Sequence, residues 1–208
     1  MQPLVEQLRR LPGEGAERLL LLGDLFQAWV GFRQYETPGV RIFLDAIADL
    51  RRRGLRVDYV EGNRDFFLAQ GPYRAGFDSV GFECAFESAG VRYLAVHGDG
   101  LNDRDRQYLA WRWLSKSGPV KTVIRALPRG VVGRVVDAAE RRLSRTNFKH
   151  RAEIPETAIR RYAARRLAEG HDVMLLGHFH EPRTLHVAGG EVRLLDAWFR
   201  SRRVEWLG

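Results

Sequence analysis

The chain has 208 residues, of which 45% are apolar, so it is long enough for one domain with a substantial core and an insertion. The single cysteine, Cys84, excludes an internal disulfide and favours a reducing compartment. No apolar run reaches the length of a membrane span, and the N-terminus lacks the order of a signal peptide, so we expect a cytoplasmic protein.

Helices and strands are expected to alternate along the chain. Apolar residues at helical spacing, such as Phe43, Ile47 and Leu50, predict an amphipathic helix that ends before Gly54. Short apolar runs that stop at Gly, Asp or His predict buried strands. In chain order we expect helix 4–11, strand 19–22, helix 40–53, strands 55–60 and 91–96, helix 156–169, and strands 172–176, 184–187, 192–197 and 204–207, with Gly189-Gly190 as a hairpin turn.

The segment 104–151 differs from the remainder in charge and in pattern. It contains 13 Lys or Arg and three acids, a net charge of +10, which leaves −2 on the rest of the chain. Apolar stripes at 120–127 and 132–143, separated by Pro128 and Gly130, predict a helical hairpin. Its basic residues form either an ordinary solvated surface or a docking face for phosphates, nucleic acid or an anionic membrane. We expect one domain, 1–208, with 104–151 as a helical lid inserted within it.

Polar side chains with metal-binding capacity follow four of the expected strands. Taken singly, each is more simply a turn residue or a satisfied polar group, but four coincidences of one chemistry favour a shared site at the carboxyl ends of the strands. Carboxylate, amide and imidazole donors suit Mn²⁺, Fe²⁺, Zn²⁺ or Mg²⁺ rather than a thiolate-bound metal. The candidate ligands are Asp24, Asn63, His97, His178 and His180.

These residues carry a family resemblance. The runs around them, in chain order, are Gly23-Asp24, Gly62-Asn63, His97-Gly98-Asp99 and Gly177-His178-Phe179-His180. They resemble the motifs of the calcineurin-like metallophosphoesterases. The run from Gly62 to Phe66 has Arg where many members have His. In this it is similar to the motif of the family branch that acts in lipid A biosynthesis. The resemblance implies an α/β sandwich of two packed mixed sheets flanked by helices.

The resemblance also implies roles for single residues. Asp24 would bridge two Mn²⁺ ions, Asn63, His97 and His178 would complete the shell of one, and His180 would bind the other. Substrate contacts would come from Arg64, which suits a bidentate contact with phosphate, and from Asp105, Asn147 and Lys149. For Arg64 and Asp105, a local ion pair is the simpler alternative.

One family element is missing from this sequence. The family pattern begins with Asp-x-His after a first strand, and no such run precedes Asp24. Two interpretations follow. Either the sequence begins inside the first crossover, which we favour because a lost inner strand would expose its neighbours, or the chain has lost one metal site. The second interpretation leaves the activity of this chain open.

The implied function is metal-dependent hydrolysis of the phosphoric anhydride of a lipid-linked nucleotide, in the cytoplasm at the inner membrane. The apolar stripes of segment 104–151 would bind acyl chains, and its basic residues would face an anionic membrane surface. Three alternatives remain: a phosphoesterase of other nucleotides or diesters, a non-catalytic relative with a degenerate metal site, and a nucleic-acid binder. We rank the last lowest, because the aromatic residues of the basic segment fall at helical spacing.

Overall fold

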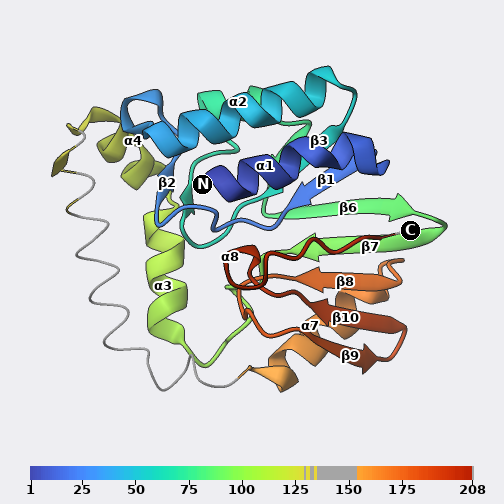
Figure 1. Ribbon diagram of the computed structural model, residues 1–208. Helices are drawn as coiled ribbons and strands as arrows, with labels where there is room; N and C mark the ends of the chain where they lie inside the picture. The colour runs from blue at the N-terminus through green and yellow to red at the C-terminus, as the bar shows by residue number, and fades with distance from the viewer. Residues whose placement is uncertain (129, 132–133, 135–153, 208) are drawn as a thin grey trace. The chain divides into compact units, whose positions relative to one another are not determined.

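The computed structural model describes residues 1–128, 130–131, 134 and 154–207 (Figure 1). They form two compact units, Met1–Cys84 and Ala85–Gly208. The first contains α1 (Gln2–Arg10), η1 (Leu11–Glu14), β1 (Arg18–Leu21), β2 (Trp29–Val30), η2 (Arg33–Tyr35), α2 (Pro38–Arg52), β3 (Arg56–Val60), β4 (Asp65–Phe66), η3 (Pro72–Gly76) and β5 (Ser79–Gly81). The second contains β7 (Val91–Val96), α3 (Arg106–Ser115), α4 (Gly118–Ala126), α7 (Glu156–Leu167), β8 (Val173–Leu176), β9 (Arg183–Val187), β10 (Gly190–Leu194) and α8 (Trp198–Ser201), and β6 (Glu83–Ser88) crosses the boundary.

The N-terminal unit is built on a parallel sheet in the order β1-β3-β5, beside a short parallel pair of β2 and β4. α2 begins where the Thr37 hydroxyl accepts a hydrogen bond from the Val40 N–H, with Pro38 in its first turn. α1 packs beside α2 (Figure 1). Trp29 is buried and makes edge contacts with the rings of Phe43 and Tyr59. Because β1 and β3 run parallel and are adjacent, the loops that follow them leave the same edge of this sheet.

The C-terminal unit is built on a five-stranded sheet in the order β6-β7-β8-β10-β9. β7, β8 and β10 run parallel, and β9 turns back onto β10 as an antiparallel hairpin at Gly189 and Gly190. α7 packs against β8 and β9 (Figure 1) and buries Ile159, Ala163 and Leu167 in the core of this unit. The apolar face of α7 thus packs against β8, the strand that is followed by the loop of His178 and His180.

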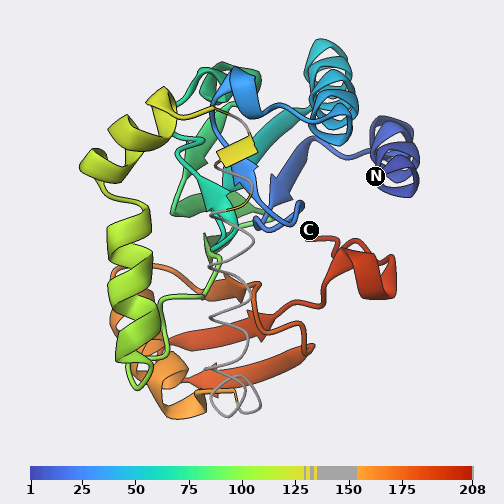
Figure 2. The ribbon, with the colours of Figure 1, turned by 90° about the vertical axis from the view of Figure 1, so that its left-hand side faces the viewer.

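Helices α3 and α4 follow β7 and lie in the basic segment. Figure 2 shows them following one another on the left of the view, in yellow-green and yellow. The side chain of Asp105 caps α3 by accepting a hydrogen bond from the Tyr108 N–H at 3.0 Å. α4 confirms a helix at the first apolar stripe, whereas the apolar residues of the second stripe lie outside the described residues. The single domain and the lid stay predictions. None of the described helices is long and apolar enough to span a bilayer.

The expected elements are confirmed with small shifts of their ends, except the last. Strand 204–207 is wrong, because residues 202–207 form neither helix nor strand. No neighbouring strand binds this segment within the described part of the chain, and Trp206 is 54% exposed. Instead, the Ser88 hydroxyl donates a hydrogen bond to the Leu207 carbonyl at 3.1 Å. The expected strand 192–197 is shifted: β10 runs from Gly190 to Leu194, and Leu194 pairs with Arg183, the first residue of β9.

Candidate metal centre

Two loops of the N-terminal unit carry Asp24 and Asn63, after β1 and β3 respectively. They approach closely where Gly23 meets Gly62: a Cβ on Gly23 would lie 2.4 Å from the Gly62 nitrogen. Gly23 has φ 74° and Asp24 has φ 56°, both in the left-handed region. Glycine adopts that conformation freely, and aspartate adopts it at a modest cost that the contacts around Asp24 offset.

A second aspartate, Asp65 at the start of β4, contacts both of these loops. Its Oδ2 accepts hydrogen bonds from the backbone N–H of Asp24 at 3.0 Å, the N–H of Gly62 at 2.8 Å and the hydroxyl of Tyr59 at 3.1 Å. Burial, followed by the Asp65 and Asp24 carboxylates, raises the pKa of Tyr59 well above its ordinary value, so Tyr59 stays a proton donor. The backbone N–H of Arg64 donates to Oδ1 of Asp24 at 2.8 Å, which orients that carboxylate. The sequence alone indicated no role for Asp65.

The C-terminal unit brings His97 and His178 together. Their rings lie edge to face, with centroids 5.2 Å apart. His97 follows β7 and is 3% exposed, and His178 follows β8 with φ 58°. Two imidazoles that bind one ion at about 2.0–2.1 Å have centroids roughly 5 Å apart, so the pair has a separation that suits a shared cation. His180 has φ 54° and is exposed, and its carbonyl accepts a hydrogen bond from Arg200 at 2.5 Å.

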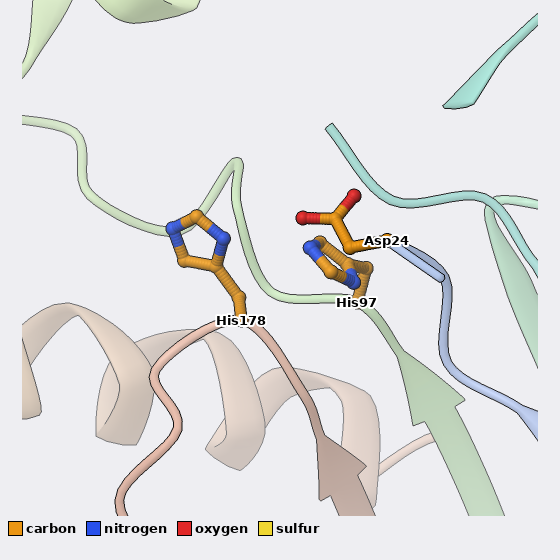
Figure 3. A group of neighbouring side chains, drawn as sticks. All are labelled: Asp24, His97 and His178. Atoms are coloured by element: carbon orange, nitrogen blue, oxygen red, sulfur yellow. The ribbon is translucent and has the colours of Figure 1, made fainter. Parts of the chain in front are cut away.

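Figure 3 draws Asp24, His97 and His178, each from the loop after a strand. Among the described residues they offer a carboxylate oxygen and two ring nitrogens, the donor types of a divalent-cation site. This donor set fits Mn²⁺, Fe²⁺ or Zn²⁺ and contains no sulfur. The chemistry expected from the sequence is therefore available at these positions.

A buried carboxylate links α3 to the loop that carries His97. Asp99 accepts hydrogen bonds from Nε of Arg112 at 2.5 Å and from the Tyr108 hydroxyl at 2.7 Å. Burial acts to raise the pKa of Asp99, but the charges of Arg112, His97 and Lys116 outweigh it and lower that pKa to about 2. The first helix of the basic segment is thus bound to the His97 loop by a charged, buried contact.

The predicted substrate residues lie in different surroundings. Nη1 of Arg64 donates a hydrogen bond to Oε1 of Gln27 at 2.7 Å, on the exposed side of the Asn63 loop. Asp105 caps α3, a structural role that differs from the substrate contact and the ion pair expected from the sequence. Asn147 and Lys149 lie outside the described residues. The roles of these four residues therefore stay predictions.

Comparison with known proteins identifies relatives along most of the chain. No protein-family model matches it. A protein of Ralstonia nicotianae named UDP-2,3-diacylglucosamine hydrolase is 29% identical over 204 residues, 93% of this chain and 76% of the relative. Proteins of the same name are 33% identical in Stutzerimonas stutzeri, over 89% of this chain and 79% of the relative, and in Escherichia coli O9:H4, over 84% and 74%.

These matches confirm the resemblance drawn from the motifs. They run through the units that hold Asp24, His97 and His178, and they cover well over two thirds of each relative. The chain belongs to the UDP-2,3-diacylglucosamine hydrolase family.

Proposed function

We propose that this chain hydrolyses the pyrophosphate bond of UDP-2,3-diacylglucosamine, releasing UMP and 2,3-diacylglucosamine 1-phosphate in lipid A biosynthesis. The observation that carries the proposal is the 33% identity to a hydrolase of that name over 79% of its length. The paired imidazoles of His97 and His178 add the chemistry that such a hydrolase needs.

We propose Asp24, Asn63, His97 and His178 as ligands of one divalent cation, with Mn²⁺ as the expected ion, and Asp24 and His180 as ligands of a second. When bound, such ions lower the pKa of a water molecule and neutralise charge on phosphoryl oxygens. The chain's own residues hold the site's shape: the Arg64 N–H orients the Asp24 carboxylate, and the buried environment of His97 restricts its ring.

Arg64 is our candidate for binding the substrate pyrophosphate. Its guanidinium is a planar fork that pairs two N–H donors with two phosphate oxygens. The contact with Gln27 restrains the side chain before substrate arrives, which lowers the entropy lost on binding. Asp105, Asn147 and Lys149 are proposed contacts of the sugar and its acyl groups.

We further propose that α3 and α4 contact an anionic membrane surface on the cytoplasmic side. Trp113 is 75% exposed, Val123 57% and Leu114 50%, so three large apolar side chains lie at the surface of these two consecutive helices. Lys121 and Arg125 lie on the same helix as Val123. Apolar side chains with neighbouring cations are the pattern of a helix that lies in a membrane interface. The substrate's acyl chains would be drawn from that interface.

The direct test is release of UMP from UDP-2,3-diacylglucosamine by the purified chain. We expect hydrolysis that EDTA abolishes and Mn²⁺ restores, and that His178→Ala reduces by at least about 100-fold, since a lost ligand weakens both metal binding and charge stabilisation. Equal turnover of UDP-N-acetylglucosamine would favour a general nucleotide hydrolase. No turnover of any pyrophosphate, with no metal bound, would identify a non-catalytic relative and contradict the proposal.

A further inference from the structure

We infer that Asp65 is a positioning residue for the metal centre: it binds no ion itself but fixes the two loops that carry Asp24 and Asn63. The inference rests on the proposed function, since it assigns Asp65 a role toward a proposed metal ligand. All of its evidence lies within the N-terminal unit.

Three donors from separate parts of that unit meet at one oxygen of Asp65. The Asp24 N–H comes from the loop after β1, the Gly62 N–H from the loop after β3, and the Tyr59 hydroxyl from β3 itself. Asp65 has no exposed surface, so each contact forms away from water. A carboxylate oxygen accepts several donors more strongly than a neutral amide oxygen does, which explains an acidic residue at a buried position.

The contact with Asp24 acts on a strained backbone. Asp24 has φ 56°, in the left-handed region, which non-glycine residues adopt at an energetic cost that is smaller for aspartate than for most. The Asp24 N–H donates to Asp65, and the Asp24 carboxylate accepts from the N–H of Arg64. Both the backbone and the side chain of Asp24 are therefore bound by the two residues that follow Asn63. Without Asp65, the Asp24 backbone can relax and carry its carboxylate away from the direction a cation requires.

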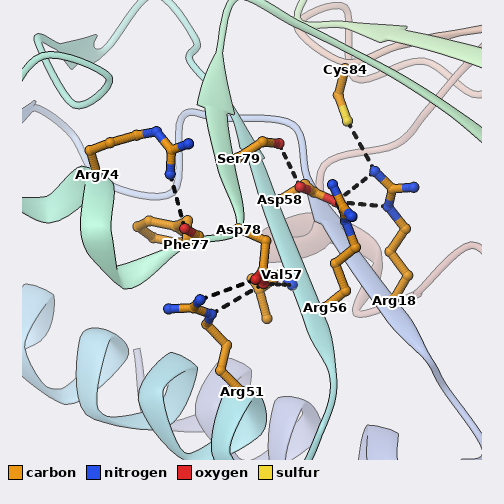
Figure 4. A network of polar contacts seen from close by, with 10 residues as sticks. All are labelled: Arg18, Arg51, Arg56, Val57, Asp58, Arg74, Phe77, Asp78, Ser79 and Cys84. Carbon is orange, nitrogen blue, oxygen red and sulfur yellow. Dashed lines mark hydrogen bonds and ion pairs between the residues drawn. The ribbon is translucent and has the colours of Figure 1, made fainter.

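The same unit offers a matched control. Asp58 is also fully buried, on β3, and it binds Arg18, Arg56 and Ser79 (Figure 4). None of these partners belongs to the Asp24 or Asn63 loop. Asp58→Asn therefore removes the charge of an aspartate that is buried like Asp65, without removing a contact to the loops of Asp24 and Asn63.

The test compares Asp65→Asn, Asp65→Ala and Asp58→Asn with the wild-type chain at a temperature well below unfolding. Mn²⁺ affinity is measured for each variant by calorimetry. The values of kcat and KM are measured at saturating Mn²⁺, and Tm is measured by thermal unfolding. We expect Asp65→Asn to weaken Mn²⁺ binding about 10- to 100-fold, as lost support of a metal ligand does, with KM unchanged. Asp65→Ala should weaken it more, and Asp58→Asn should lower Tm while leaving Mn²⁺ affinity at the wild-type value.

Tyr59→Phe is a milder second variant, for the case in which the Asp65 variants do not fold. It removes one hydrogen-bond donor to Asp65 and keeps the Asp65 carboxylate. It should weaken Mn²⁺ binding roughly 2- to 10-fold, the effect of one hydrogen bond. Wild-type Mn²⁺ affinity in folded Asp65→Asn or Tyr59→Phe, or an equal loss in Asp58→Asn, would overturn this inference alone. Absence of Mn²⁺ binding by the wild-type chain would overturn the proposed function and this inference together.

Discussion

Gly23 and Gly62 lie so close that a side chain on Gly23 would collide with the backbone of its neighbour: the Cβ would be 2.4 Å from the Gly62 nitrogen and 2.7 Å from its Cα. The contact is between two main chains, so no side-chain rotation can relieve it. The contact fixes the distance between the loops that present Asp24 and Asn63. It requires glycine at position 23 for a tertiary reason, in addition to the positive φ.

Gly23→Ala should therefore destabilise the chain by more than ~2 kcal/mol, because it combines a positive φ with a backbone collision. It should also weaken Mn²⁺ binding in the folded fraction. Gly15→Ala is the control, since Gly15 has φ 83° but nothing within 4 Å of an added Cβ. That change should cost about 1 kcal/mol from φ alone. Urea unfolding of both variants measures the difference, and equal losses would show that the collision contributes nothing.

Replacement of Arg64 should weaken the contact with substrate and leave metal binding unchanged. Arg64→Ala should lower kcat/KM on UDP-2,3-diacylglucosamine by at least about 10-fold while Mn²⁺ affinity stays unchanged, because a charged bidentate contact is lost. Arg64→Lys keeps the charge but loses the fork, so it should recover only part of the rate. Gln27→Ala should have a smaller effect through the lost 2.7 Å restraint on Arg64. A lysine variant as active as wild type would contradict the bidentate role.

The exposed apolar residues of α3 and α4 should control membrane binding. Trp113→Ala combined with Val123→Ser should lower partitioning into vesicles of anionic phospholipid several-fold, since both side chains are more than half exposed and apolar. Cleavage of a small water-soluble phosphodiester should not change. Trp206→Ala is the control, an exposed tryptophan outside these helices. Cosedimentation at low salt measures binding, and equal partitioning of all three proteins would contradict a membrane-facing role.

Asp78 should make stability depend on pH. Burial acts to raise its pKa, but hydrogen bonds from the Val57 N–H at 2.7 Å and from Arg51 outweigh it and leave the pKa below the usual 3.8. A carboxyl whose pKa is lowered by folding stabilises the native state above its unfolded pKa and loses that effect as pH falls through the folded value. The stability lost in Asp78→Asn, roughly 1–3 kcal/mol at pH 7, should therefore shrink below pH ~4. Urea unfolding at pH 7 and pH 3 measures this, and a pH-independent loss would contradict the charged contact.

Much of the fold follows from local patterns in the sequence. The strand 91–96 is found with the same bounds, and α2 differs from its expected helix by one or two residues at its ends. These elements have a strong apolar period and clear stop signals, so their own residues determine them. The sequence did not predict β2, β4 and β5, because segments of two or three residues have no period to detect, and it did not predict the longer strand β6.

The candidate site shows the same division. Asp24, His97 and His178 lie in the loops that follow predicted strands, so the sequence alone indicates them as candidate ligands. Asp65 and Asp99 were not recognised as supporting residues, because their value depends on partners that meet only in three dimensions, such as Arg112 across from Asp99. Each lies two residues beyond a predicted ligand, which is the one signal in the sequence that points to a supporting role. The strand expected at 204–207 failed for a related reason, since apolar residues alone do not supply a pairing partner.

The most direct test of the metal centre is anomalous diffraction from crystals of the chain grown with Mn²⁺. The account predicts a strong anomalous peak bonded to a ring nitrogen of His97, a ring nitrogen of His178 and a carboxylate oxygen of Asp24. A peak found only at residues outside the proposed ligands would contradict the account. Crystals of the chain soaked in Mn²⁺ that show no peak beside His97 and His178 would also contradict it.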